Sequence, residues 1–141
     1  MDYAKSVTDN IRDSGWHLQG VFPTKADDGP AFVYSIGIGR MFGIELLCIG
    51  NFPPNIVAAM LNTVASKFVV DNEVTMDGML DIGWNCPMKL RRCGPRAKED
   101  YTIQVGTFFK EPYEVIQVML CDKHGVYQDD ERCEFGKVDM P

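Results

Sequence analysis

Residues 44–69 read IELLCIGNFPPNIVAAMLNTVASKFV, an apolar run followed by a proline pair and a helical stripe. Pro53 and Pro54 preset the backbone dihedral at which a helix starts. Apolar residues then recur at helical spacing, which predicts an amphipathic helix from about Pro54 to Val69. The residues of this wide stripe are Ile56, Val57, Met60, Leu61, Val64 and Phe68. The run before the prolines, residues 44–49, is apolar at nearly every position and not only at alternate ones. It therefore predicts a central strand, buried on both faces, beneath the helix.

The sequence on the N-terminal side of this unit predicts one more helix and two more strands. Residues 3–14 carry apolar side chains four residues apart, which indicates a short helix that ends at Gly15. Residues 16–22 alternate and predict a half-exposed strand with His17 on its more polar face. Residues 31–38 are apolar at both alternate sets of positions and predict a second central strand. The Asp-, Gly- and Pro-rich residues 24–30 predict the loop between these strands.

The sequence on the C-terminal side is less regular. Residues 79–93 predict a broken strand pair around Gly83 and Pro87. Residues 99–109 fit both periods, and we favour a helix there over a strand. Residues 113–121 alternate and predict a strand, followed by a turn at residues 122–125 and a return strand or bulge from Val126. The charged residues beyond Asp129 predict a loosely held tail.

These elements predict one α+β domain over residues 1–141, with a mostly antiparallel or mixed sheet and two or three helices packed on it. A chain of 141 residues can bury a core without disulfides or metal ions. The sequence contains no internal repeat, no low-complexity tract and no linker long enough to divide it. A single domain is therefore the simplest interpretation.

Composition indicates which partners and which compartment to expect. The net charge of −6 disfavours a nucleic-acid binder, because phosphates require a clustered positive surface. Apolar runs fall short of the ~20 residues of a membrane-spanning helix, and the N-terminus does not resemble a signal peptide. We therefore expect a cytoplasmic protein that binds no membrane. Five cysteines, an odd number spread through apolar segments, favour reduced thiols over a disulfide framework.

Patterns that could carry chemistry are few. Gly37, Gly39 and Gly43 follow a predicted strand, but the next segment is strand-like, so a glycine-rich strand connection is favoured over a phosphate-binding loop. A zinc site could be imagined from Cys86, Cys93, Cys133 and His124, but no two of these four are separated by two to four residues, so we expect neither a metal nor another cofactor. A cysteine nucleophile would need His17 or His124 beside it, and nothing in the sequence indicates that proximity.

Polar residues placed where apolar ones are expected provide the candidate site. Tyr34 interrupts a central strand, Glu45 opens the next, Gln117 lies in the late alternating strand and Asp122 begins its turn. His17 is the nearest titratable neighbour. Each has a structural alternative: a satisfied core tyrosine, an ion pair from Glu45 to Arg40, a solvent-facing glutamine and an aspartate closing its own turn. We predict that these side chains line one cleft for a small polar ligand or a partner protein's side chain.

Several segments also indicate a family. GWHLQGV at 15–21, FVYSIG at 32–37 and FGIELL at 42–47, followed by Gly50 and Asn62, resemble the Domain of Unknown Function 4262 family of bacteria and their phages. IQV at 116–118 and DKHG at 122–125 resemble its closing strand and turn. The family usually has proline where this chain has Ile44, and an aromatic-proline pair where it has Tyr127-Gln128. The resemblance implies an α+β fold and no particular activity.

Two hypotheses for function follow. The first is a non-catalytic binding or interaction module of a bacterium or phage that binds a partner protein or a small polar ligand. A host-modulating role is one form of this hypothesis. The second is a small enzyme acting on a metabolite or nucleotide. In that enzyme Glu45 or Asp122 would be the general base, assisted by His17 or His124.

Overall fold

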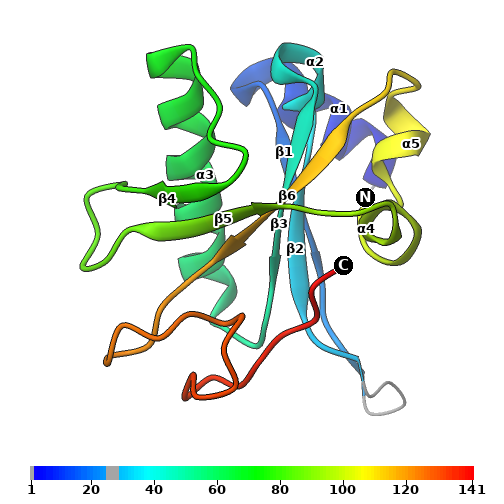
Figure 1. The fold of residues 1–141 in the computed structure, drawn as a ribbon. Helices are drawn as coiled ribbons and strands as arrows, with labels where there is room; N and C mark the ends of the chain where they lie inside the picture. Colours follow the sequence, from blue (N-terminus) through cyan, green and yellow to red (C-terminus); the bar gives the residue numbers. More distant parts are fainter. Residues whose placement is uncertain (1, 25–28) are drawn as a thin grey trace.

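A six-stranded mixed sheet in the order β1-β2-β3-β6-β5-β4 forms the centre of the molecule (Figure 1). Its strands are β1 His17–Val21, β2 Phe32–Ile36, β3 Ile44–Ile49, β4 Gly78–Leu80, β5 Met88–Arg92 and β6 Glu114–Met119. The computed structural model describes residues 2–24 and 29–141, so residues 25–28 of the predicted loop lie outside the described residues. β3 and β6 pair in parallel, and every other pair is antiparallel. The predicted α+β class with a mixed sheet is confirmed.

Two longer helices and three short ones surround the sheet in the described part of the chain. They are α1 Tyr3–Ser14, α2 Gly39–Phe42, α3 Pro54–Asp71, α4 Arg96–Asp100 and α5 Val105–Phe108. The side chain of Asp2 caps α1 by accepting from the Lys5 N–H, and Gly15 ends it in the left-handed region at φ 95°. α3 starts at the predicted proline pair and continues two residues beyond the predicted end.

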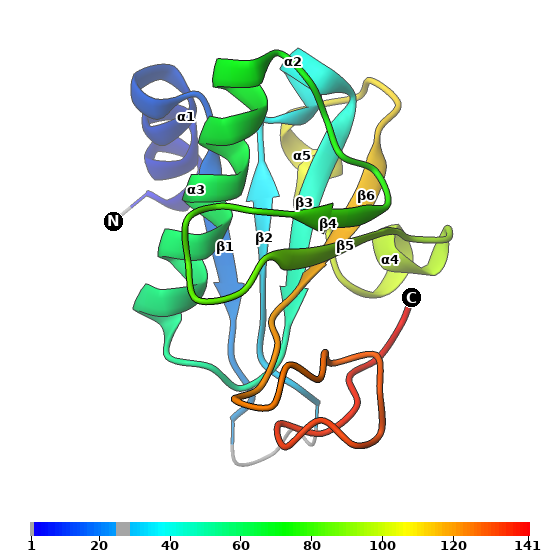
Figure 2. The same ribbon diagram turned by 60° about the vertical axis from the view of Figure 1, so that its left-hand side comes forward.

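The two faces of the sheet carry separate apolar cores, and α3 lies in front of the sheet in the view of Figure 2. On one face α3 contributes Met60, Leu61 and Val64, all fully buried against β3, β5 and β6. Ile56, which the helical stripe places in this contact, is 41% exposed. It lies in the first turn of α3, where the helix begins at the edge of the sheet. On the other face, residues of α1, α4 and α5 pack on β2, β3 and β6.

The predicted helix over residues 99–109 is two short helices with a break between them. The Tyr34 hydroxyl accepts the Gln104 N–H at 3.2 Å, and the Thr102 N–H returns to the Ala97 carbonyl. These contacts satisfy backbone groups that a continuous helix would have used. The predicted return strand from Val126 is reduced to one bridge between Cys121 and Tyr127.

Residues 129–141 form no helix or strand, yet several of them are hydrogen-bonded to side chains of the sheet and of α4. Arg96 binds the Asp139 carboxylate through two nitrogens, at 2.7 and 2.6 Å, and Arg91 donates to the Pro141 carbonyl. In both views the orange-to-red segment lies beneath the ends of β3 and β6 (Figures 1 and 2). The C-terminal segment therefore forms a wall at this end of the sheet.

Among the described helices, none combines the length and the apolar composition needed to cross a membrane.

Candidate functional site

Glu45 lies at the start of β3 with no exposed surface and four hydrogen-bond donors around its carboxylate. The Ser35 hydroxyl donates at 2.7 Å, and the N–H groups of Gly37, Ile38 and Gly39 donate at 2.9, 3.1 and 3.1 Å. The Ser35 Oγ also accepts the Leu46 N–H at 2.8 Å, just past the end of the β2–β3 ladder. Glu45 thereby fixes the connection between the two strands.

The glycine-rich connection is an anion cradle that the protein fills itself. Gly37 has a φ of 122°, which frees consecutive N–H groups to converge, and α2 begins directly after them. The segment after these glycines is strand β3, as the sequence predicts, but a four-residue helix that the sequence did not predict, α2, spans Gly39–Phe42 before it. Arg40 reaches the Gly15 carbonyl instead of pairing with Glu45. Backbone donors, not a cation, hold this carboxylate.

The electrostatics of Glu45 follow from its burial. Loss of hydration raises the pKa of Glu45 to about 7, while the hydrogen bonds from Ser35 and the three backbone N–H groups act in the opposite direction. Such a pKa would suit a general base. The carboxylate has no route to a substrate in this structure, however, because its exposed fraction is 0%.

Tyr34 and Gln117 lie in one row across the sheet, since both pair with Leu47. Burial raises the pKa of Tyr34 to about 12, and its hydroxyl accepts the Gln104 N–H. The Gln117 amide is buried, not solvent-facing: its oxygen accepts from Arg91 and its nitrogen donates to the Asp139 carbonyl, both at 2.9 Å. Both side chains hold other segments against the sheet.

Asp122 follows β6 and closes its own turn. Its carboxylate accepts the N–H groups of His124 and Val126, and also that of Glu134, each at 2.9 Å. These backbone hydrogen bonds, the one from Glu134 above all, lower the pKa of Asp122. Like Glu45, this carboxylate organises backbone around it.

His17 is half-buried on the edge strand β1. Its Nδ1 lies 2.8 Å from the Asn10 side-chain nitrogen, and its ring meets Tyr3 edge-on. Burial lowers the pKa of His17. The histidine therefore packs between β1 and α1.

The five predicted site residues are only partly brought together. Alternation along β3 places Glu45 on the same sheet face as Tyr34 and Gln117, where the helices and the C-terminal segment cover them. Asp122 lies past the opposite end of the parallel pair from Glu45, and His17 lies on the edge strand. None of the hollows described below is lined by two of the five.

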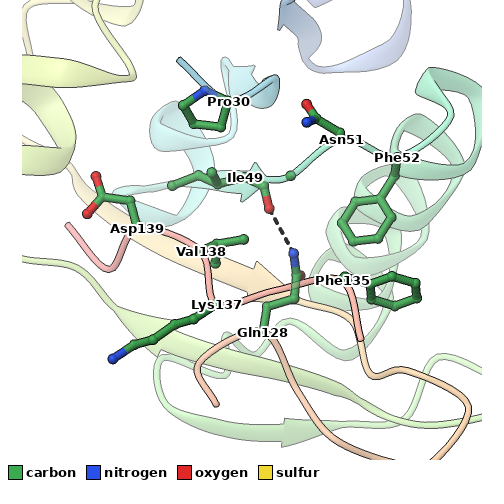
Figure 3. A pocket seen from close by; sticks show the side chains of 10 residues that line it. Pro30, Ile49, Asn51, Phe52, Gln128, Phe135, Lys137, Val138 and Asp139 are labelled. Carbon is green, nitrogen blue, oxygen red and sulfur yellow. Dashed lines mark hydrogen bonds between the residues drawn. The ribbon is translucent and has the colours of Figure 1, made fainter. Parts of the chain in front are cut away.

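A hollow of about 400 Å³ opens where β3 ends, and we call it the C-terminal hollow (Figure 3). Residues from the β3 end and the C-terminal segment line it: Pro30, Ile49, Gly50, Asn51, Phe52, Gln128, Phe135, Lys137, Val138 and Asp139. Phe52 and Phe135 meet edge to face at 5.1 Å and form one side, with Lys137 and Asp139 on the other. Its volume lies in the range of small-molecule sites, about 300–1,000 Å³.

Gln128 joins the two walls of the C-terminal hollow. It is 1% exposed; its amide nitrogen donates to the Ile49 carbonyl, and its oxygen accepts the Leu120 N–H. A Cβ at Gly50 would lie 2.9 Å from that nitrogen and 2.6 Å from the Phe52 ring. Gly50 therefore permits the close approach of Gln128 and of Phe52.

The residues of the C-terminal hollow were missed in the sequence. Asn51, Phe52, Gln128, Phe135 and Lys137 belong to no strand or helix, and none interrupts an apolar pattern. The one available signal was the departure at Tyr127-Gln128 from the family pattern. The buried Gln128 amide makes two hydrogen bonds that a proline at this position could not make.

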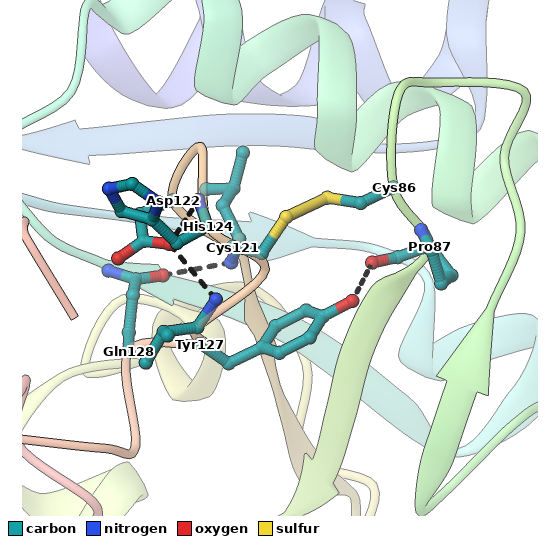
Figure 4. Close-up of a disulfide and its surroundings, with 9 residues drawn as sticks. Cys86, Pro87, Cys121, Asp122, His124, Tyr127 and Gln128 are labelled. Atoms are coloured by element: carbon teal, nitrogen blue, oxygen red, sulfur yellow. Dashed lines mark hydrogen bonds between the residues drawn. A yellow bond between two sulfur atoms is a disulfide. The ribbon is translucent and has the colours of Figure 1, made fainter. Parts of the chain in front are cut away.

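The expectation that all five cysteines are reduced is wrong, because Cys86 and Cys121 form a disulfide (Figure 4). Cys86 lies in the connection between β4 and β5, and Cys121 follows β6. An odd number of cysteines spread through apolar segments does not reveal which chain segments the sheet brings together. Cys48, Cys93 and Cys133 are free thiols. Within residues 2–24 and 29–141, no cluster of three or more His, Cys, Asp or Glu side chains could hold a metal ion.

The family resemblance is confirmed by comparison with known families. A family model described as Domain of unknown function (DUF4262) matches residues 10–134, which is most of the chain. The chain belongs to the DUF4262 family. The matched region includes Glu45 and its cradle, the disulfide and Gln128, whereas Phe135, Lys137 and Asp139 lie beyond its end. No curated protein matches the sequence.

Among solved structures, the chain is similar to a suspected homologue of SUFU (suppressor of fused protein) from Neisseria gonorrhoeae. The two share 14% sequence identity, with 88% of this chain and 80% of that chain covered, at a TM-score of 0.49. A likeness this distant supports no inference about activity.

Proposed function

We propose that this DUF4262 protein is a binding module whose C-terminal hollow takes a small polar ligand bearing an acidic group. The observation that carries the proposal is the use made of buried polar side chains. Two buried amides join coil to the sheet: Gln117 on β6 donates to the Asp139 carbonyl, and Gln128, itself in coil, donates to the carbonyl of Ile49 at the end of β3. Buried amides are costly unless satisfied, and here they hold an irregular segment as a fixed wall.

The lining indicates the chemistry of the ligand. Asp139 is neutralised by Arg96, whereas Lys137 has no hydrogen bond or ion pair to any described residue. The Asn51 side chain accepts the Ala31 N–H through its oxygen, which leaves its amide nitrogen for a ligand acceptor. Lys137 would therefore attract a carboxylate or phosphate, and the Asn51 amide would donate to a second acceptor of the ligand. The planar part would lie against Phe52 and Phe135.

Benzoate and phenyl phosphate are suitable probes, with benzyl alcohol as the neutral comparison. Titration into ¹⁵N-labelled protein should shift amide resonances at residues 50–52 and 137–139 for the two anions and weakly for the alcohol. Lys137→Gln should weaken anion binding about two- to fivefold. Phe135→Ala should weaken it by up to roughly tenfold, because the aromatic wall is lost.

Lys67→Gln on α3 is the matched control, since it removes an exposed lysine far from the hollow in sequence and should leave binding unchanged. Equal melting temperatures for the three variants would exclude a folding defect. Anions that shift no hollow resonance, or that bind equally well to Lys137→Gln, would contradict the proposal. Resonance shifts produced only by added protein would instead favour a partner protein.

The geometry gives the catalytic alternative no accessible general base, because Glu45 is enclosed and Asp122 is occupied by three backbone N–H groups. A cytoplasmic location, a bacterial or phage setting and a host-modulating role stay predictions.

A further inference from the structure

The Cys86–Cys121 disulfide lies between two surface hollows. One, of about 540 Å³, is lined by Asn85, Cys86, Cys121, Asp122, Lys123 and Gly125. The other, of about 290 Å³, is lined by Trp84, Asn85, Cys86, Met88, Leu120 and Cys121. Both cysteines are half-buried, and both line both hollows. An attacking thiol needs access to a disulfide sulfur.

The other cysteines differ from this pair in surroundings. Cys48 lies in the core, where burial raises the pKa of its thiol to about 12, and Cys133 is 4% exposed. Burial also raises the pKa of Cys93. A thiol held protonated and enclosed reacts slowly. Redox chemistry in this protein is therefore concentrated at the disulfide.

The charges around the larger hollow favour an acidic thiol. Lys123 has no hydrogen bond or ion pair to a residue within 2–24 or 29–141. The Asp122 carboxylate stays ionised, but it is held by three backbone N–H groups, whereas the Lys123 ammonium is unpaired among the described residues. Lys123 can thus attract a carboxylate of an incoming molecule and stabilise a thiolate formed at the neighbouring Cys121.

The two segments stay joined when the disulfide opens. The Tyr127 hydroxyl donates to the Pro87 carbonyl at 2.6 Å, and β5 pairs with β6 from Lys89 and Met119 onward (Figure 4). The bridge between Cys121 and Tyr127 also remains. Opening the sulfur bond therefore leaves the sheet intact, as reversible exchange requires.

We propose that Cys86–Cys121 is a thiol–disulfide exchange site for small acidic thiols of the glutathione class. The incoming thiolate attacks Cys86 Sγ and forms a mixed disulfide, while the Cys86–Cys121 bond breaks and its electron pair leaves on Cys121 Sγ. A second thiolate attacks the sulfur of the bound molecule and displaces the Cys86 thiolate. The products are two protein thiols and one small-molecule disulfide, a two-electron reduction of the protein. No residue of this site lines the C-terminal hollow, so the two proposals stand independently.

The test uses the full chain, purified without reductant and mixed anaerobically with reduced glutathione or with cysteamine, whose charge is positive. Acid quenching, alkylation and peptide mass mapping then locate the products. We expect three alkylatable thiols before mixing and five at completion. A transient glutathione adduct should appear on Cys86, with Cys121 alkylated. Glutathione should react faster than cysteamine relative to their rates with a free model disulfide.

Lys123→Gln should lower the glutathione-to-cysteamine rate ratio about fivefold. Lys110→Gln, which removes an exposed lysine after α5, should leave the ratio unchanged. Five free thiols before any thiol is added would overturn the proposal. So would adducts confined to Cys93, or a rate ratio that does not respond to Lys123→Gln.

Discussion

A carboxylate without exposed surface loses its hydration, and Glu45 recovers part of that loss through four hydrogen-bond donors. Three of these donors are backbone N–H groups of a glycine-rich connection, the arrangement that other proteins use to hold phosphate. Here the anion is a side chain ten residues from Ser35, its hydroxyl donor. The glycine-rich connection, which superficially resembles a phosphate-binding loop, therefore binds a side chain of the protein itself and has a structural role.

Glu45 should make stability depend on pH in a particular window. Its pKa of about 7 in the folded protein exceeds the value near 4.5 of the unfolded chain. The folded state therefore binds more protons between these pH values. The stabilisation is fully present below about pH 4.5 and is lost as pH rises through 7, with a slope approaching about 1.4 kcal/mol per pH unit.

Chemical denaturation of the wild type and of Glu45→Gln across pH 4–8 measures this effect, because other titrating groups cancel in the difference. Glu45→Gln should be less stable by about 1–3 kcal/mol at pH 4.5, since its amide nitrogen faces N–H donors. The gap should narrow toward pH 7. A gap that stays constant over this range would show that Glu45 does not titrate there.

Among the helices and strands, the sequence predicted correctly those segments whose apolar residues follow a single period. α3 and β3 follow from a helical stripe and an apolar run that no long-range contact overrides. The segment from Arg96 to Phe108 could not be predicted, because its break depends on the distant Tyr34 hydroxyl. The same limit applies to the candidate site. Polar residues in apolar strands were found, but their partners come from elsewhere in the chain.

Leu61→Asp tests the placement of α3. It would bury an unpaired charge among the fully buried residues of that face, and should cost several kcal/mol, enough to unfold a marginal domain. Circular dichroism at increasing temperature should show loss of the cooperative transition. Ile56→Asp on the same helix is the control and should melt close to the wild type, since Ile56 is 41% exposed. Comparable melting of both variants would mean that α3 packs differently.

At the scale of the whole molecule, the C-terminal segment is attached by side chains from three distant elements. Arg96, Arg91 and Gln117 all bond to residues 139–141. Composition predicted a loosely held tail there, because charged residues without periodicity do not reveal their partners. Sheet order brings these partners together only in the folded chain.

Asp139→Asn should loosen the segment without unfolding the sheet. Arg96 holds the pKa of the Asp139 carboxyl well below its usual range, so this stabilisation is present near neutral pH and is lost on acidification below about pH 4. The pair is partly exposed, and we expect a loss of about 1 kcal/mol. Hydrogen exchange should accelerate at residues 137–140 and stay unchanged in β3. Unchanged exchange in the segment would mean that the ion pair does not anchor it.

The parallel pairing of β3 with β6 has a consequence for synthesis on the ribosome. Residues 44–47 of β3 can pair with residues 114–117 of β6 only after β6 has been synthesised. The centre of the sheet therefore cannot form until most of the chain has been made. Until then β3, whose six residues are all buried in the finished protein, offers an open apolar edge to other nascent chains. Such non-local pairing also slows folding, because a long loop must close before its contacts form. Yield from overexpression should therefore depend on chaperones that shield β3 during translation.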